Sequence, residues 1–209
     1  MATLSELQTK IAARLLDTSN TVVSLTQITA QINDTIKTWK YKRFWFNEAS
    51  GNITLTAASA TLTPPSDFLI EIPKNGFTIN YGNVKWPITK VSPLRYDDED
   101  AQGNGLPYMY KWVGGVYSVY YIPDQAYTVI CKYLKDYDDL SDSSDTNDFT
   151  TNAEDLIIYD SLAKLHGELR QDEKMEGYYS ARAENEYAIL RDFTSKYTGS
   201  GRLSVDSIL

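Results

Sequence analysis

Residues 109–122 read MYKWVGGVYSVYYI, two runs of aromatic and β-branched residues separated by Gly114-Gly115. A two-residue glycine loop supplies the positive φ angles of the primed turns that close β-hairpins, so this stretch predicts a hairpin. Pro123-Asp124-Gln125 then turns the chain, and residues 127–133 carry an apolar or aromatic side chain at every second position, which is typical of a strand. We expect the three runs to form an antiparallel meander.

Shorter β signals precede this hairpin. Residues 52–56, NITLT, alternate apolar and polar side chains, and residues 60–63 do so before Pro64-Pro65. Residues 68–72 and 77–81 are further runs with β-favouring side chains. About seven short strands are therefore predicted in the middle of the chain.

Two helices are predicted on each side of this β region. Thr3 and Ser24 each precede an apolar stripe at three-to-four-residue spacing, and each has Glu or Gln three residues later, which is the capping-box signature. Thr151 is expected to cap a third helix in the same way. Residues 172–197 carry the stripe of a fourth helix.

The fold class that follows is α+β. Neither helical pair can bury its stripe alone, so we expect a four-helix bundle formed by the N- and C-terminal helical pairs, with an inserted antiparallel β domain. The change of period at Phe44-Trp45-Phe46 marks the start of the insertion, and a run rich in Asp and Ser follows it. The expected organisation is a discontinuous bundle at 1–43 plus 150–197, a β insertion domain at 44–135, a solvated acidic linker at 136–149, and a flexible C-terminal tail at 198–209.

The composition argues against several classes of protein. The 209 residues carry 20 Lys+Arg and 28 Asp+Glu, a formal net charge of −8. Because affinity for nucleic acid comes largely from cationic side chains, this balance disfavours a module that grips duplex DNA. The single cysteine, Cys131, cannot form an intrachain disulfide. Neither a membrane span, which needs roughly 18 apolar residues, nor a signal peptide is expected.

Residues for catalysis and metal binding are sparse. The sequence has no nucleophile elbow, no phosphate-binding glycine loop and no paired histidines. The aspartates between 136 and 148 lack the glycine and glutamate spacing of a calcium loop. His166 lies on an apolar helix face and is expected to be a hydrogen-bonded packing residue, and Cys131 is expected to be buried in a strand. We expect no enzyme, no metal and no cofactor.

The aromatic residues of the β region leave alternatives open. They could fill a small core, form a protein interface or stack on sugars. Acid pairs, Glu184 with Glu186 or Asp172 with Glu176, keep a hydrolase open as a further alternative. The aromatic residues in or beside the hairpin are Tyr108, Tyr110, Trp112, Tyr117, Tyr120 and Tyr121.

Three segments, in this order between the helical pairs, together resemble a known family. They are Phe44-Trp45-Phe46-Asn47-Glu48, Leu62-Thr63-Pro64-Pro65-Ser66-Asp67-Phe68-Leu69, and the run from Pro107 through the glycine hairpin to Val129. The chain resembles the head-to-tail adaptor (connector) proteins of tailed double-stranded-DNA bacteriophages, of the tail tubular protein A-like kind, over residues 1–197. It departs from that pattern at Pro64, where a leucine or tyrosine commonly stands.

The resemblance implies a structural protein of the virion neck, assembled in the host cytoplasm. It implies a homo-oligomeric ring, usually of twelve copies, between the portal protein and the tail or nozzle protein. The helical bundle would line a channel through which double-stranded DNA passes without tight binding, and an acidic chain agrees with such a channel. The alternative is a carbohydrate-binding β module on a helical stalk.

The last residues of the sequence are the candidate partner-binding site. Four aliphatic side chains follow a Gly-Ser-Gly hinge there, as they would in a docking strand. In the resembling family the C-terminal segment commonly engages the portal. The residues expected to bind the portal are Arg202, Leu203, Val205, Ile208 and Leu209.

Overall fold

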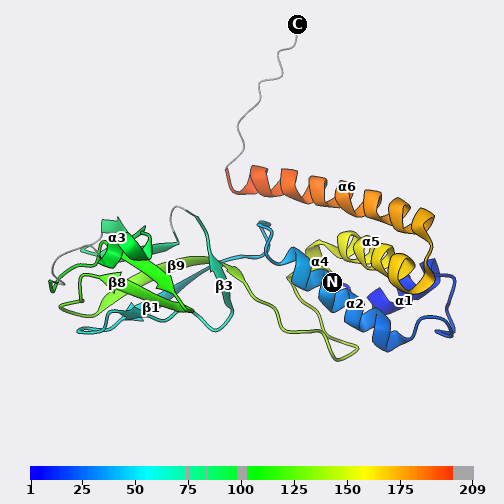
Figure 1. Cartoon of the computed structure of the whole chain (residues 1–209), viewed down its shortest axis with the longest axis horizontal. Coiled ribbons are helices and arrows are strands. Elements are labelled where there is room, and N and C mark those ends of the chain that lie inside the picture. Colours follow the sequence, from blue (N-terminus) through cyan, green and yellow to red (C-terminus); the bar gives the residue numbers. More distant parts are fainter. Residues whose placement is uncertain (74–75, 83, 98–102, 200–209) are drawn as a thin grey trace, which may run out of the picture. The chain divides into compact units, whose positions relative to one another are not determined.

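The computed structural model of the chain describes residues 1–73, 76–82, 84–97 and 103–199. Helices and antiparallel sheets are both present, so the fold class is α+β, as predicted. The chain divides into two compact units, which Figure 1 shows with the chain coloured by sequence. The helical unit is Met1–Asn47 with Tyr137–Leu209, and the β unit is Glu48–Asp136.

The helical unit is built around α5, which packs against α1, α2 and α6. Figure 1 shows α5 between α6 and α1. In the described part of the chain, no helix is long and apolar enough to cross a membrane. The helices of this unit are α1 (Leu4–Arg14), α2 (Leu25–Trp39), α4 (Asp148–Asn152), α5 (Glu154–Leu165), the π-helical turn η1 (His166–Arg170) and α6 (Glu173–Tyr197).

The capping residues account for where most of these helices begin. Thr3 and Ser24 form the predicted capping boxes at the starts of α1 and α2, and Asp172 accepts a hydrogen bond from the first turn of α6. Thr151 is not a cap, contrary to expectation. Asn147 caps the short α4 instead, and α5 begins without a side-chain cap.

The predicted apolar stripes face one core. The fully buried side chains include Leu7 and Ile11 of α1, Ile28 and Ile32 of α2, and Leu156 of α5. These residues repeat every three or four positions because that spacing keeps side chains on one side of a helix. The helical core is therefore the part of the fold that periodicity predicts best.

Phe44-Trp45-Phe46 belongs to this helical core and does not start the β domain. The rings of Phe44 and Phe46 stack with centroids 5.1 Å apart, and Phe149 meets both edge-on. Buried Asn47 fixes the turn, since its side chain accepts a hydrogen bond of 2.9 Å from the Phe44 N–H. The first strand begins only at Glu48. The bulky side chains of residues 44–46 predicted a strand, but in the structure a short turn places them in the helical core.

The predicted acidic linker, 136–149, has mostly exposed side chains, but it is also anchored to the helical core. Leu140 is buried in the helical core, and its backbone N–H and C=O both bond the Asn33 side chain, at 2.9 and 3.0 Å. The Asp145 carboxylate accepts two backbone N–H groups of the same segment at 2.7 Å. Its carbonyl accepts the Leu4 N–H at the start of α1. Polar side chains therefore provide hydrogen-bond partners for backbone groups of this segment, and composition alone does not predict such bonds.

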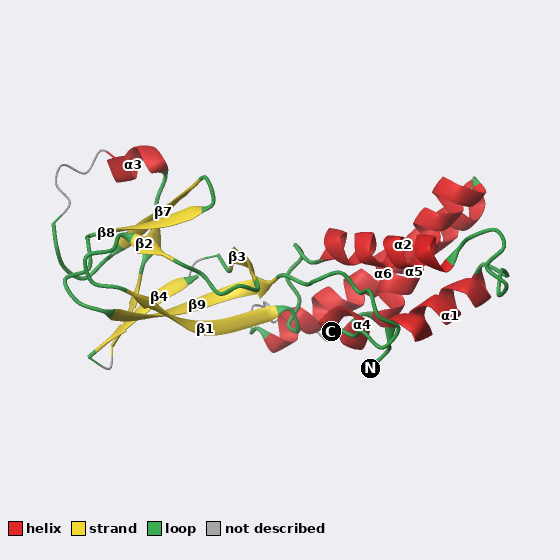
Figure 2. Cartoon of the chain, turned by 90° about the horizontal axis from the view of Figure 1, so that it is seen from below, coloured by secondary structure: helices red, strands yellow, loops and turns green. Residues whose placement is uncertain are grey.

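The β unit contains two sheets, seen side-on in Figure 2. The first has the order β1-β9-β4-β5, with β3 also paired to β9, and the second has the order β2-β8-β7-β6. All pairs are antiparallel except the short parallel pair of β6 with β7. The elements are β1 (Glu48–Leu55), β2 (Thr61–Leu62), β3 (Phe68–Glu71), β4 (Phe77–Tyr81), β5 (Val84–Pro87), β6 (Thr89–Lys90), the helix α3 (Pro93–Asp97), β7 (Met109–Val113), β8 (Val116–Tyr120) and β9 (Tyr127–Lys135).

The glycine hairpin is confirmed, but the three-strand meander is wrong. Gly114 and Gly115 have φ angles of 61° and 85° and join β7 to β8. After Pro123, however, the chain leaves this sheet, and β9 becomes the centre of the other one, where it pairs with β1 along its length. Its alternate residues, including Val129 and Cys131, are buried in the core of the unit. Alternation predicted this buried face but not the partner strands.

Candidate interaction surfaces

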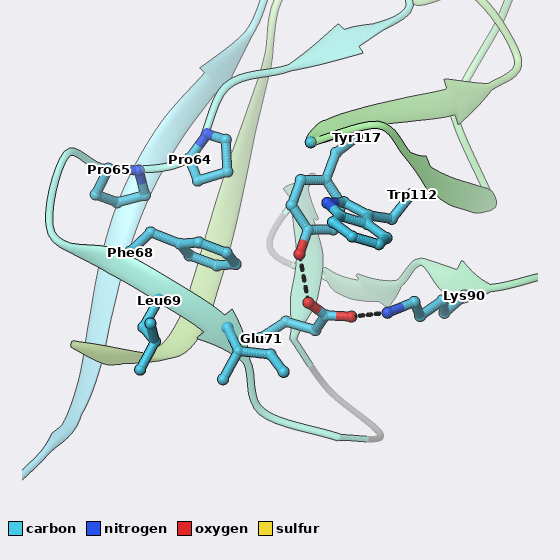
Figure 3. A pocket seen from close by; sticks show the side chains of 10 residues that line it. Pro64, Pro65, Phe68, Leu69, Glu71, Lys90, Trp112 and Tyr117 are labelled. Carbon is cyan, nitrogen blue, oxygen red and sulfur yellow. Dashed lines mark hydrogen bonds and ion pairs between the residues drawn. The ribbon is translucent and has the colours of Figure 1, made fainter. Parts of the chain in front are cut away.

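A buried carboxylate connects the two sheets of the β unit. Glu71 ends β3 in the first sheet, while Lys90 in β6 and Tyr117 in β8 belong to the second. Figure 3 shows the Glu71 carboxylate between them. One oxygen pairs with the Lys90 ammonium, and the other accepts the Tyr117 hydroxyl at 2.5 Å. A Cβ at Gly76 would lie 2.7 Å from the Glu71 Cβ, so glycine makes room for this side chain.

Electrostatics keep this carboxylate charged. Burial by itself would raise the pKa of Glu71, but the hydrogen bonds from Lys90 and Tyr117 outweigh burial and lower it. For the Tyr117 hydroxyl, burial and the bond to Glu71 act together to raise its pKa. The arrangement is thus a satisfied structural ion pair, with its proton fixed on the tyrosine.

Two cavities flank this pair. One, of about 440 Å³, is walled by apolar residues including Phe68, Leu69 and Trp112. The other, of about 570 Å³, lies toward Ile72 and Tyr110. Among the described residues that line these two cavities, Glu71 is the one carboxylate, so they provide no pair of acids of the kind that the hydrolase alternative requires.

The hairpin aromatics divide between core and surface. Tyr110 and Tyr117 pack against Phe77 with ring centroids 5.1 Å away in each case. Tyr120 is also buried, whereas Tyr108 and Trp112 are about half-exposed. Three of the six hairpin aromatics, Tyr110, Tyr117 and Tyr120, therefore fill the core. The half-exposed rings offer a partner only a small surface.

His166 is buried as expected, but it is not hydrogen-bonded. Neither ring nitrogen has a partner within the described residues, and the ring stacks on Tyr179 at 5.5 Å. Burial lowers the pKa of His166, and nearby Arg170 lowers it further against the opposing effect of Asp172. The residue packs as a neutral ring.

Comparison with known proteins identifies the family. A sequence profile of the SU10 adaptor protein family matches residues 2–205. This chain belongs to the SU10 adaptor protein family. It is therefore a phage adaptor, a structural component of the virion that interacts with other head–tail proteins. No curated protein matches the chain.

The sequence-predicted site residues of this SU10 adaptor have separate outcomes. Arg202, Leu203, Val205, Ile208 and Leu209 lie outside the described residues, so their role stays a prediction. Cys131 is buried as expected, and burial raises the pKa of its thiol to about 12. Over the ranges described above, no three His, Cys, Asp or Glu side chains gather in a way that could hold a metal ion.

Sequence reasoning missed the pair of Glu71 and Lys90. A signal was present, because Glu71 is the one charged residue in the apolar run 68–72. A charge inside a half-buried strand generally needs a partner. What the sequence could not supply was the partner, since Lys90 lies 19 positions away on another sheet.

Proposed function

We propose that this adaptor forms a ring in the virion neck, between the portal protein and the tail or nozzle protein, as tail tubular protein A-like connectors do. The observation that carries the proposal is the match to one adaptor family over residues 2–205. A ring of about twelve copies, with the helical unit as a four-helix bundle lining a DNA channel, is the arrangement we expect.

Electron microscopy of the purified protein, alone and mixed with portal rings, tests this function. We expect closed rings with a central opening, either free or seated on the portal. Particles that stay monomeric in both samples would refute the neck-ring proposal. Counting the subunits in class averages gives the stoichiometry independently.

The channel is proposed to conduct duplex DNA without retaining it. At −8 per copy, a ring of about twelve copies would carry a formal charge near −96, which repels phosphates close to the wall. We expect no submicromolar binding of rings to duplex DNA at moderate salt. Tight binding in a filter or fluorescence assay would argue against a conduit.

The segment Arg202–Leu209 is proposed to dock on the portal. Burying its four aliphatic side chains would contribute about 1.5–3 kcal/mol each before ordering costs. We expect its deletion to leave the melting temperature nearly unchanged while abolishing cosedimentation with portal rings. Replacing Ser204 and Ser207 by alanine is the matched control and should keep binding. Undiminished cosedimentation of the deletion variant would exclude this docking.

The β unit is proposed to be a separable insertion. Glu48 pairs with Leu134 across β1 and β9, so the chain enters and leaves this unit on neighbouring strands. A short flexible linker in place of residues 48–136 should therefore leave a folded, helical product. Loss of all helical circular dichroism would show that the helical unit needs its insertion.

A further inference from the structure

The loop between α1 and α2 presents apolar side chains to solvent. Leu16 is 90% exposed and Val22 is 60% exposed, and Leu25 at the start of α2 is 46% exposed. We call these three residues the loop surface. All three lie within residues 16–25, whose remaining side chains are mostly polar. Three exposed aliphatic residues in one short loop favour contact with a partner.

Leu16 occupies a position that suits glycine. Its φ is 55°, in the left-handed region. The Leu16 N–H bonds the Ala13 carbonyl at 3.2 Å and the Asp17 N–H bonds the Ala12 carbonyl at 3.0 Å, which is the helix ending at which glycine is preferred. In an isolated subunit, leucine is unfavourable here both for its backbone and for its exposed side chain. A contact with another molecule would give this side chain a role.

The loop is held in one shape by Asp17. Its buried carboxylate accepts hydrogen bonds from the N–H groups of Val23, Val22 and Thr21 at 2.8 to 2.9 Å. These bonds, with the one from Val23 strongest, lower the pKa of Asp17 to about 2, so the group is charged at neutral pH. A loop that is ordered beforehand loses little conformational freedom when it binds.

A small cavity beside the loop contains an unsatisfied acceptor. It has a volume of about 210 Å³ and lies between α1 and the loop, with Gln8, Thr18 and Asn20 among its lining residues. The Asn20 Oδ1 atom is buried and has no hydrogen-bond donor within the described residues. A partner that covers this surface could supply a donor as well as apolar contact.

A second, different apolar surface lies on α6. Ile189, Phe193 and Tyr197 are 48%, 44% and 71% exposed and follow one another at four-residue spacing, so they share one side of the helix. We call these three residues the α6 surface. Trp45 supports it, with ring centroids 6.1 Å from Phe193 and 5.6 Å from Tyr197. Exposed Lys196, on the same stretch of helix, pairs with Asp192 at 2.8 Å, and its ammonium lies 5.6 Å from the centre of the Phe193 ring.

We propose that the loop surface of one copy binds the α6 surface of a second copy. The proposal rests on the ring proposed above and names the contact that closes it. One unit carries two unlike apolar surfaces, and α5 separates α1 from α6 (Figure 1). Unlike surfaces on one subunit join copies head to tail, which is the contact that builds rings. Residues 15–25 contain one charged side chain, the buried Asp17, so charge repulsion between acidic copies is small here.

Leu16→Gly separates binding from folding. Glycine relieves the left-handed backbone, so the melting temperature of the subunit should stay the same or rise. Sedimentation velocity over a concentration series measures ring formation, which should require a protein concentration about tenfold higher or more. Ala58→Gly is the matched control, since Ala58 is exposed in the β unit with a φ of 60°, and it should leave assembly unchanged. Unchanged assembly of Leu16→Gly would overturn the proposal.

Cross-linking gives a test that does not depend on stability. Cys131 is buried and its pKa is raised to about 12, so the native chain should not react with a short bismaleimide. A mixture of Leu16→Cys and Phe193→Cys chains should cross-link, whereas each variant alone should not. A chain carrying both substitutions should give a ladder that ends at the ring. Rings without a 16-to-193 cross-link would refute this contact and leave the ring standing, whereas an absence of rings in the native protein would refute both.

Discussion

The helical unit and the β unit use polar side chains for different purposes. In the helical unit, Asp17, Asn33 and Asn47 bond the backbone of loops and so fix the segments between helices. In the β unit, Glu71 bonds side chains of the opposite sheet, and Asp67 accepts the Tyr133 hydroxyl at 2.8 Å. The three residues of the first unit hold loops against a core, although buried Ser161 and Thr35 also join α5 to α2, and those of the second hold elements of its sheets together.

The two cores differ in the same sense. The helical core is mainly aliphatic, with one phenylalanine cluster formed by Phe44, Phe46 and Phe149. The β core is rich in tyrosines, whose hydroxyls need hydrogen-bond partners. Apolar truncation should therefore be most damaging in the helical unit, and loss of a single polar partner should matter most between the sheets. Single substitutions in each unit test this contrast.

Phe149→Ala should be the most destabilising of these changes. Phe149 is fully buried and meets Phe44, Phe46 and Tyr137 edge-on at 5.2 to 5.9 Å. Truncation removes these contacts and leaves a cavity, so we expect a loss of about 3–5 kcal/mol in the free energy of unfolding. Denaturant titration followed by circular dichroism measures it, with hydrogen exchange reporting each unit separately.

The matched control for this substitution is Phe193→Ala in the same unit. Phe193 is 44% exposed, so its loss should cost about 1 kcal/mol or less in an unassembled subunit. Equal losses in the free energy of unfolding for the two variants would mean that the phenylalanine cluster is not the centre of the helical core. Faster exchange in β9 of Phe149→Ala would show that the two units do not unfold separately.

Asn33→Ala should cost about 2–3 kcal/mol, because it removes two hydrogen bonds and leaves the buried backbone of Leu140 without partners. Hydrogen exchange should rise in residues 138–146 and stay unchanged in the β unit. Asn185→Ala, at an exposed position on α6, is the control and should be nearly neutral. If exchange in 138–146 did not change, this segment would not depend on Asn33, and the contrast between the units would weaken.

Periodicity and local turn chemistry explain why so much of the secondary structure could be predicted. Capping boxes at Thr3 and Ser24, the glycine turn after Val113 and the alternation in β9 all act over a few residues, and all are present. Strand partners were not predictable in this way, because β9 is joined to β8 by a turn yet pairs with three other strands. Nothing local specifies such long-range pairing.

The candidate surfaces were less predictable than the fold. Phe44 was assigned to the β region and the burial of Leu140 in the linker was missed, because composition describes an average, whereas a single buried side chain decides whether a segment packs. The sequence gives no signal for the left-handed φ of Leu16, because leucine is not a residue type that favours this conformation. Glu71 was visible as a charge, but its partner lay on another sheet.

Lys90→Met removes the ion pair that joins the two sheets. It should cost about 1–2 kcal/mol in the free energy of unfolding at pH 7, since Tyr117 would be the one side chain left to bond Glu71. In the native protein the lowered pKa of Glu71 stabilises the fold above roughly pH 4, and this stability is lost as pH falls. Without Lys90, the Tyr117 and backbone hydrogen bonds oppose burial alone, so the pKa of Glu71 should rise and its contribution to stability should shrink. The deficit of the variant should therefore grow from pH 4 to pH 7 in denaturant titrations. Exposed Lys132→Met is the control, and a deficit independent of pH would mean that Glu71 is not held charged by Lys90.

His166→Phe should have the smallest effect and the opposite sign, because it removes two buried nitrogens without partners while keeping a ring to stack on Tyr179. At pH 8, where the imidazole is neutral in both states, we expect a gain of about 1 kcal/mol. Burial and Arg170 lower the pKa of His166 in the folded chain, so below about pH 6.5 the unfolded chain binds a proton first and the native protein loses stability. The variant lacks this loss, so its advantage should widen from pH 7 to pH 5 in parallel denaturant titrations. An advantage that stayed constant would mean that the folded protein binds the proton as readily as the unfolded chain does. His166 would then have a hydrogen-bond partner that the structure does not show.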